Sequence, residues 1–238
     1  GVEHWRRHRG RCMGALYWQL NDCWPVASWS SIDYGGRWKA LHYAAKRFFA
    51  PLLLSAVWED EAVALYLSNE QRTPVEGTVI WRLRDHGVRV LSEGSRETRL
   101  SPLSAKKCMT IDLKDFDGWF DPEKCYLDYR FFSNGQELSA GTMLFTKPKY
   151  FAFLDPGLTC ELSEVEDGFA IRVKAKAFAK AVYLELDGVD GVFSDNFFDL
   201  PGETEKEVRL DISRLAMDLS LKELQEKLVV TSLFEHAR

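Results

Sequence analysis

Residues 14–38 read GALYWQLNDCWPVASWSSIDYGGRW and hold four of the eight tryptophans of this 238-residue chain. The run 14–20 is almost continuously apolar instead of alternating, which is typical of a strand buried on both faces, as in a parallel sheet or a barrel. Large aromatic faces next to amide and carboxylate groups also form sugar-binding sites. We therefore expect a buried strand over 14–20, followed by a loop that is either a sugar-binding surface or an aromatic packing corner.

Both flanks of this stretch read as helices. Residues 3–9 form the last turns of one helix, closed by Gly10, and apolar residues recur at helical spacing over 37–50 until Pro51 ends the pattern. A helix–strand–helix piece cannot bury its own surfaces, because a βα unit needs neighbouring strands. We therefore expect residues 1–50 to be the end of a larger α/β domain, with the chain starting inside a helix. A basic cluster at the start is expected to be a solvated helix face, and it comprises His4, Arg6, Arg7, His8, Arg9 and Arg11.

After Pro51 the apolar period changes to two, which predicts half-buried antiparallel strands. About seven short strands over 51–147 favour an immunoglobulin-like sandwich, with Asn134-Gly135 as the turn of a hairpin. Lys147-Pro148-Lys149 is the expected linker, because a proline between charged residues breaks both periods. The clearest strands of this part are expected around residues 63–67, 79–83, 127–131 and 140–146.

A second set of alternating segments over 148–238 predicts a second sandwich. A helical turn is expected near Ser220 and Glu223, which have capping-box spacing. The strands of this part are expected around 169–173, 182–186, 208–210 and 228–234.

Composition excludes several classes of function. The net charge of -5 shows no large basic field, which argues against nucleic acid or an anionic membrane surface as a partner, and no apolar run is long enough to span a membrane. The five cysteines are scattered without a Cys-x-x-Cys pair or a histidine at metal-ligand spacing, so we expect neither a disulfide framework nor a metal site. The chain has no phosphate-binding glycine motif, and we expect no cofactor.

Hydrolysis of a glycoside needs two facing carboxyl groups, and the acids near the aromatic cluster are Asp22 and Asp33. Asp22 follows the predicted strand and could point into a site at its carboxyl end, or could cap the loop backbone. Asp33 lies in a turn composition. Asp195, Asn196 and Asp199 could supply oxygen ligands for calcium, but turn capping at a sandwich corner accounts for them better.

The residues of both ends resemble a known family. MGALYWQLNDCWP at 13–25, continued by SWSSIDY at 28–34 and RWKALHY at 37–43, resembles the end of the catalytic barrel of β-mannosidases, members of glycoside hydrolase family 2. FSDNFFDLPG at 193–202 resembles their last sandwich domain. The resemblance implies a mainly β chain, with two immunoglobulin-like antiparallel β-sandwiches (51–147 and 148–238) preceded by the last helix–strand–helix piece of a (β/α)8 barrel (1–50). It also implies an exo-acting enzyme that removes terminal β-linked mannose with retention of configuration.

The resemblance assigns residues 14–20 to the eighth barrel strand. Both catalytic glutamates follow earlier strands in this family, so we expect them upstream of Gly1, no catalytic residue in this chain, and no activity of the chain alone. Trp18 would line the subsite for the terminal mannose. Asn21 and Asp22 would either touch sugar hydroxyls or hold the loop, while packing is favoured for Trp24, Trp29 and Trp38.

The partners expected from the resemblance are a β-mannoside or manno-oligosaccharide substrate and the upstream catalytic domain of the same polypeptide. Two alternatives stay open. The sandwiches could form a non-catalytic carbohydrate-binding or interaction module, with exposed aromatics such as Trp58, Trp119 or Phe120 as its signature. The parent could instead be a related family 2 glycosidase acting on galactosides or glucuronides. The compartment stays open as well.

Overall fold

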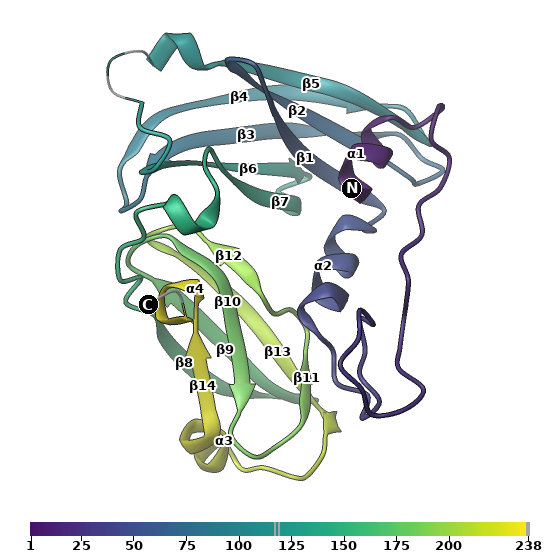
Figure 1. Ribbon diagram of the computed structural model, residues 1–238, viewed down its shortest axis with the longest axis vertical. Helices are drawn as coiled ribbons and strands as arrows, with labels where there is room; N and C mark the ends of the chain where they lie inside the picture. Colours follow the sequence, from purple (N-terminus) through teal and green to yellow (C-terminus); the bar gives the residue numbers. More distant parts are fainter. Residues whose placement is uncertain (117, 119, 237–238) are drawn as a thin grey trace. The chain divides into compact units, whose positions relative to one another are not determined.

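The computed structural model describes residues 1–116, 118 and 120–236. Its strands pair antiparallel in four sheets, and the chain divides into two compact units (Figure 1). The first unit comprises residues 1–16 and 46–152, and the second comprises 17–45 and 153–238. The N-terminal fifty residues are therefore shared between the two units. Within the described residues, no helix is long and apolar enough to cross a membrane.

The first unit is a two-sheet sandwich. One sheet has the order β1-β2-β5 and the other β4-β3-β6-β7. The Asn134-Gly135 hairpin is confirmed: both residues have positive φ, as a tight two-residue turn between β6 and β7 requires. The elements of the first unit are α1 (Val2–Arg7), β1 (Leu52–Glu59), β2 (Ala62–Asn69), β3 (Val75–Asp85), β4 (Val90–Leu100), β5 (Ser104–Asp112), η1 (Leu113–Phe116), β6 (Cys125–Ser133), β7 (Gln136–Leu144) and η2 (Pro148–Tyr150).

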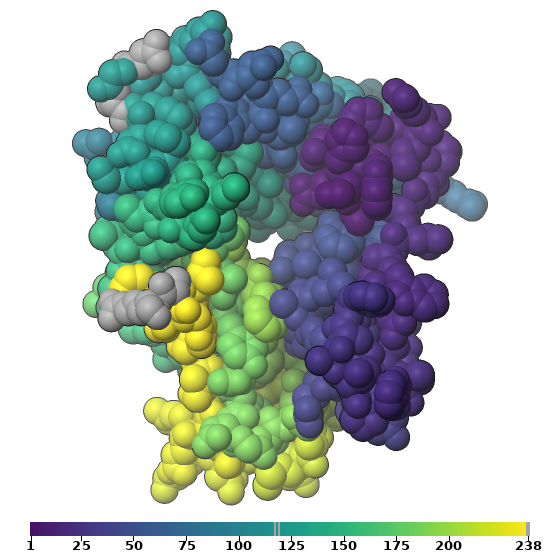
Figure 2. Space-filling view, in the orientation of Figure 1, coloured from purple at the N-terminus to yellow at the C-terminus, as the bar shows by residue number. Residues whose placement is uncertain are grey.

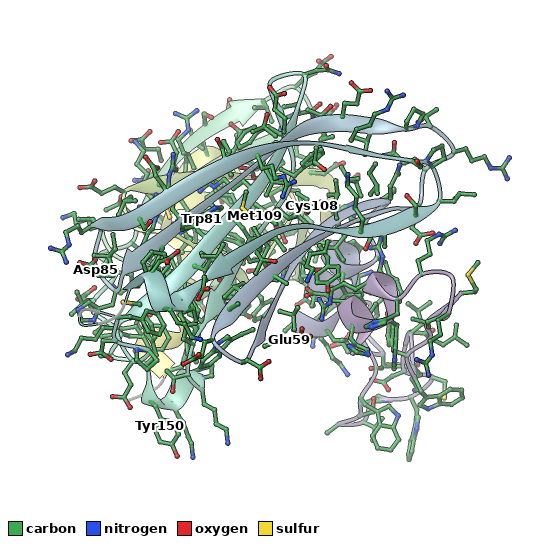
Figure 3. All side chains as sticks on the ribbon, turned by 90° about the horizontal axis from the view of Figure 1, so that it is seen from above. Glu59, Trp81, Asp85, Cys108, Met109 and Tyr150 are labelled. Atoms are coloured by element: carbon green, nitrogen blue, oxygen red, sulfur yellow. The ribbon has the colours of Figure 1, made fainter. Side chains whose placement is uncertain are left out.

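Alternating side chains of both sheets fill the core of the first unit. Trp81 and Cys108 belong to this buried cluster, and Met109 packs against it (Figure 3). Trp81 lies opposite Gly94, where an added Cβ would come within 2.7 Å of the indole Nε1. Gly141 gives the Tyr129 ring its space in the same way, since a Cβ there would lie 2.5 Å from the tyrosine hydroxyl. The two glycines are thus required by close packing rather than by turn geometry.

An ion pair is buried on the β4-β3-β6-β7 sheet. Arg84 Nε donates to Asp128 Oδ2 at 2.5 Å, and the two side chains are 7% and 3% exposed. Arg130 Nε lies 3.5 Å from the other Asp128 oxygen. Buried charges need such partners, because an unpaired charge away from water is strongly destabilising.

Helix α1 lies against β2, and the prediction of a solvated basic face is wrong for its arginines. Arg6 is 8% exposed and donates to the carbonyl of Phe48 at 2.6 Å, while Arg7 donates to the Ser55 hydroxyl at 3.1 Å. Arg9 donates to the carbonyl of Leu103 and pairs with Glu70. Arginine can do this because its long apolar stem packs against the sandwich while its guanidinium reaches a fixed acceptor.

The second unit contains another antiparallel sandwich, with sheets β11-β13-β9-β8 and β12-β10-β14. The predicted helix near Ser220 is confirmed as α3, with a complete capping box between Ser220 and Glu223. The predicted strand over 228–234 is too long, because the chain turns into α4 at Ser232, whose N–H donates to the Glu235 carboxylate and whose hydroxyl accepts from Phe234 N. The elements are α2 (Ala40–Phe48, which continues into the first unit), β8 (Thr159–Val165), β9 (Gly168–Ala175), β10 (Ala179–Leu186), β11 (Gly191–Phe193), β12 (Phe198–Leu200), β13 (Thr204–Leu215), α3 (Leu221–Lys227), β14 (Leu228–Thr231) and α4 (Leu233–His236).

The predicted strand over residues 14–20 is wrong in this structure. The segment runs without a sheet ladder, and Leu16 is 93% exposed. A strand forms only where a neighbouring strand accepts its backbone hydrogen bonds. Among the described residues, the nearest approach to such pairing is an isolated parallel bridge between Asn21 and Ile32.

Candidate functional site

Residues 17–38, here called the aromatic loop, belong to the second unit and carry the predicted site residues. Figure 2 shows this part of the chain, in dark purple, with its side chains at the surface. Its two arms are joined by backbone hydrogen bonds. Ser31 N donates to the carbonyl of Gln19 at 3.1 Å, Ile32 N donates to that of Leu20 at 2.9 Å, and Asp22 N donates back to that of Ile32 at 3.1 Å. The loop is therefore a folded element with a fixed backbone path.

Two of the three predicted binding residues lie at the surface of the aromatic loop. The Trp18 side chain is 76% exposed, and the peptide bond that follows it is cis. Asn21 is exposed too, and its amide donates at 3.2 Å to the carbonyl of Asp22. The carbonyl of Asn21 in turn accepts a hydrogen bond from Gln19 at 3.2 Å. The structure thus presents an open indole face and an amide on the same stretch of chain.

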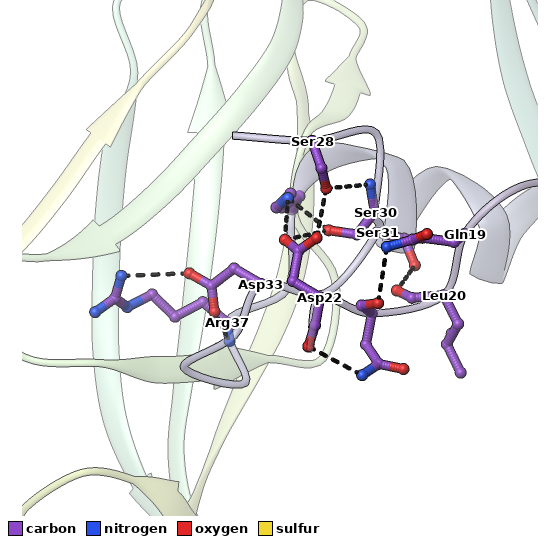
Figure 4. A network of polar contacts seen from close by, with 10 residues as sticks. Gln19, Leu20, Asp22, Ser28, Ser30, Ser31, Asp33 and Arg37 are labelled. Atoms are coloured by element: carbon purple, nitrogen blue, oxygen red, sulfur yellow. Dashed lines mark hydrogen bonds and ion pairs between the residues drawn. The ribbon is translucent and has the colours of Figure 1, made fainter. Parts of the chain in front are cut away.

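Asp22, the third predicted residue, is buried and fully engaged within the loop (Figure 4). Its Oδ1 accepts from Ser28 at 2.5 Å, and its Oδ2 accepts from Ser30 at 2.7 Å. Lys39 Nζ lies 3.2 Å from Oδ2 and donates to Ser30 at 2.6 Å. The hydrogen bonds from Ser28 and Ser30, with Lys39 adding to them, hold the pKa of Asp22 below its usual range. The Asp22 carboxylate is thus bonded to three side chains that hold the fold of the loop.

The lowered pKa of Asp22 predicts an acid-sensitive loop. A carboxylate whose pKa is lower in the folded than in the unfolded state stabilises the fold above the unfolded value, about 3.9, and loses that contribution as pH falls through its folded pKa. We expect the difference in free energy of unfolding between the wild type and Asp22→Asn to be constant near neutral pH and to shrink below about pH 4. Denaturant titrations at a series of pH values from neutral to below about pH 4 measure this difference.

The exposed Asp218 of the same unit offers the matched control. Asp218→Asn is expected to leave the free energy of unfolding near neutral pH unchanged, because its side chain is exposed. A difference between wild type and Asp22→Asn that persists unchanged into the acid range would contradict the prediction.

The other tryptophans of the aromatic loop divide into two groups. Trp24 and Trp29 are 64% and 71% exposed, so their predicted packing has no counterpart among the described residues. Trp38 does pack, edge-on against His42 at 4.3 Å and Tyr43 at 5.3 Å between ring centroids. Three further large apolar side chains of the loop are exposed, namely Leu20, Val26 and Tyr34. A contiguous exposed apolar surface marks an interaction site.

The described acids provide no pair of free facing carboxylates in the loop. Asp33 Oδ1 accepts from the backbone of Arg37 at 2.9 Å in a tight turn, as its sequence context predicted. At the sandwich corner, Asp195 pairs with Lys206 at 2.5 Å and Asp199 with Lys180 at 2.6 Å, so both carboxylates are occupied by cations. No group of three or more potential metal ligands occurs in the part of the chain that the structure describes.

Sequence reasoning missed the residues that hold the aromatic loop in place. Ser28, Ser30 and Lys39 surround Asp22, and Ser31, which is fully buried, bridges Leu20 and His42 through its hydroxyl. A local signal existed in part, because a serine-rich stretch after an aspartate is typical of side chains that bond the backbone. The partner choice depends on how the loop folds back, which spacing alone does not reveal.

Comparison with known proteins shows to which family this architecture belongs. A family model for a mannosidase Ig/CBM-like domain matches residues 61–150, and one for the Ig-fold domain of mannosidases matches 153–236. The chain is 32% identical to β-mannosidase of Capra hircus over 219 residues, covering 85% of this chain and 25% of that protein. The identity to β-mannosidase of Mus musculus is also 32%, over 238 residues, covering 94% of this chain and 26% of that protein. The chain belongs to the β-mannosidases of glycoside hydrolase family 2.

A solved structure agrees with this membership at the level of the fold. The crystal structure of β-D-mannosidase from Dictyoglomus thermophilum superposes with a TM-score of 0.86 at 22% identity, covering 98% of this chain and 28% of that one. The chain therefore spans about a quarter of the length of the relatives it matches.

Proposed function

We propose that this chain is the C-terminal part of a retaining exo-β-mannosidase, which hydrolyses terminal β-D-mannose residues. The observation that carries the proposal is the exposed indole of Trp18 on a loop fixed from beneath by the buried Asp22 network. A flat aromatic face covers the C–H side of a sugar ring, and a fixed backbone orients that face without an ordering cost on binding.

The acids of the aromatic loop are already engaged in hydrogen bonds, which bears on where the catalytic carboxyl groups come from. A retaining mechanism needs a nucleophile and an acid/base carboxyl about 5 Å apart on opposite sides of the glycosidic bond. The Asp22 carboxylate is bonded to the side chains of Ser28 and Ser30, and that of Asp33 accepts from the backbone of Arg37. We infer that the two catalytic glutamates come from a catalytic domain upstream in the same polypeptide. The exposed apolar side chains of the aromatic loop would then pack against that domain, with Trp18 left facing the substrate and Asn21 beside it near the sugar hydroxyls.

An activity assay on two proteins tests the proposal. The full-length polypeptide is expected to hydrolyse an aryl β-mannoside with retention, and the purified 238-residue chain is expected to show no turnover. Turnover by the chain alone would contradict the assignment of both catalytic acids to the upstream domain. Faster cleavage of an aryl β-galactoside or β-glucuronide by the full-length polypeptide would favour a sister glycosidase instead.

The alternative of a sugar-binding sandwich finds less support in the first unit. Trp58 is 44% exposed, but its ring packs edge-on against Phe145 at 5.6 Å between centroids. Phe120 packs on the same phenylalanine at 4.8 Å, and Trp119 lies outside the described residues. These contacts support a packing role for Trp58 and Phe120.

A further inference from the structure

The corner between β11 and β12 of the second unit is fixed from within the sandwich. The side chain of Asn196 is buried at this corner and clasps strand β10. Its Oδ1 accepts from Leu184 N at 2.9 Å, and its Nδ2 donates to the Leu184 carbonyl at 2.8 Å. The same Oδ1 accepts from Phe197 N at 2.9 Å. With three hydrogen bonds to the backbone, Asn196 holds the corner on the sheet.

Tyr43 of α2 connects this corner to the aromatic loop. Its side chain is 2% exposed, and its hydroxyl hydrogen-bonds with the backbone of Phe193 and the side chain of Asn196. Its ring lies 6.0 Å from that of Phe197 and 5.3 Å from that of Trp38. Burial raises the pKa of Tyr43 to about 12, so the hydroxyl stays protonated at neutral pH. The hydrogen bonds with Phe193 and Asn196 act the other way and lower this pKa, as bonds accepted by the tyrosine oxygen do.

Two further contacts join the aromatic loop to the same sandwich. Arg37 Nε donates to Asp190 Oδ1 at 2.8 Å, just before β11, while its other arm pairs with Asp33 at 3.3 Å. The guanidinium of Arg214, at the end of β13, lies 5.6 Å from the centre of the Trp38 ring. The loop is thus held by a hydrogen-bonded tyrosine, an ion pair and a cation–π contact.

A continuous path leads from Tyr43 to Trp18. The neighbouring residue His42 shares a hydrogen bond with the Ser31 hydroxyl at 3.0 Å. The backbone N–H of Ser31 donates to the carbonyl of Gln19 at 3.1 Å, directly after Trp18. A displacement of α2 against the sandwich would therefore move the backbone that carries the Trp18 indole.

We propose that the C-terminal sandwich positions Trp18 against the sugar, with two positioning residues: Tyr43, which bonds the β11–β12 corner, and Asp190, which lies just before β11. This inference rests on the function proposed above. It assigns the C-terminal sandwich an indirect part in substrate binding. The residues of the sandwich affect the substrate only by positioning the aromatic loop.

A double-mutant cycle in the full-length enzyme tests the proposal. Tyr43→Phe keeps the ring and removes the hydroxyl link, and it is expected to lower kcat/KM for an aryl β-mannoside by about tenfold, because small displacements of a positioning group are costly. Asp190→Asn removes an exposed ion pair and is expected to cost about threefold. In a Trp18→Ala background both losses are expected to disappear, since the positioned side chain is gone.

Two variants of the same sandwich are the matched controls. Tyr183→Phe removes a hydroxyl that donates to Glu185 of its own strand at 2.8 Å, and Glu161→Gln removes the exposed ion pair with Lys174 at 2.6 Å. Neither is expected to change kcat/KM in either background.

The outcomes separate this inference from the proposed function. Equal losses for Tyr43→Phe with and without Trp18 would show a general structural role and overturn the positioning proposal, as would no loss at all. If Trp18→Ala itself leaves kcat/KM unchanged, the sugar-contact role of Trp18 fails, and the positioning proposal fails with it.

Discussion

Replacing Trp18 by alanine in the full-length enzyme is expected to lower kcat/KM for an aryl β-mannoside by about 70-fold. A tryptophan side chain has 150–250 Å² of surface, of which one face, about 100 Å², would cover a sugar ring. At about 25 cal/mol per Å² this amounts to about 2.5 kcal/mol, and each 1.36 kcal/mol is a factor of ten. Steady-state kinetics with the purified variant measure the change.

Two further substitutions show whether the effect comes from a sugar contact. Trp18→Phe keeps a flat face and is expected to retain most of the activity. Trp58→Ala removes a partly exposed tryptophan of the first unit and is expected to leave KM unchanged. An unchanged kcat/KM for Trp18→Ala would show that the exposed indole has no part in substrate binding.

The second large effect concerns stability. Asp128→Ala leaves the buried guanidinium of Arg84 without its carboxylate, and the side chains involved are only 7% and 3% exposed. Removing one partner of a buried ion pair costs about 3–5 kcal/mol, because the remaining charge is neither hydrated nor paired. Urea denaturation of the chain, followed by tryptophan fluorescence, is expected to show a lower midpoint with an unchanged slope.

The neighbouring pair on the same sheet supplies the comparison. Arg82 and Glu93 are paired at 3.0 Å with side chains that are 35% and 61% exposed, so Glu93→Ala is expected to cost less than about 1 kcal/mol. Combining Asp128→Ala with Arg84→Met is expected to recover much of the stability, since no charge is then buried alone. A loss below about 1 kcal/mol for Asp128→Ala would mean that water reaches Arg84.

Local patterns predicted most of the fold. Period-two alternation located several strands of each sandwich, and Asn134-Gly135 specified a hairpin because its backbone conformation is a local property. The helix ending before Pro51 and the capping box at Ser220 were predictable for the same reason. The run 14–20 was not, because its apolar pattern states what the segment can bury but cannot supply the neighbouring strand that a ladder needs.

The sequence proposed residues for the candidate site but could not show what holds them in place. Trp18, Asn21 and Asp22 stood out by residue type and by resemblance, yet the sequence could not decide between a sugar contact and a loop-holding role for Asp22. That choice depends on Ser28, Ser30 and Lys39 converging on its carboxylate. The anchorage through Arg37 and Asp190 joins residues 153 positions apart, beyond the reach of any local pattern. Arg6 was misjudged because a charged residue on a short helix usually faces water.

The glycines beneath the aromatic rings of the first unit also disfavour wrong strand registers during folding. Gly94, Trp81, Tyr129 and Gly141 lie in one transverse row across β4, β3, β6 and β7. If β4 slipped by two residues, the indole of Trp81 would face Ser92 or Arg96 instead of Gly94, and a similar slip of β7 would put Ser139 or Met143 over Tyr129. Such slips keep every side chain on its original face, so hydrophobic patterning alone does not oppose them. Both the Trp81 and the Tyr129 ring fit only when each lies opposite its glycine. This row of four residues therefore specifies the register of all four strands at once.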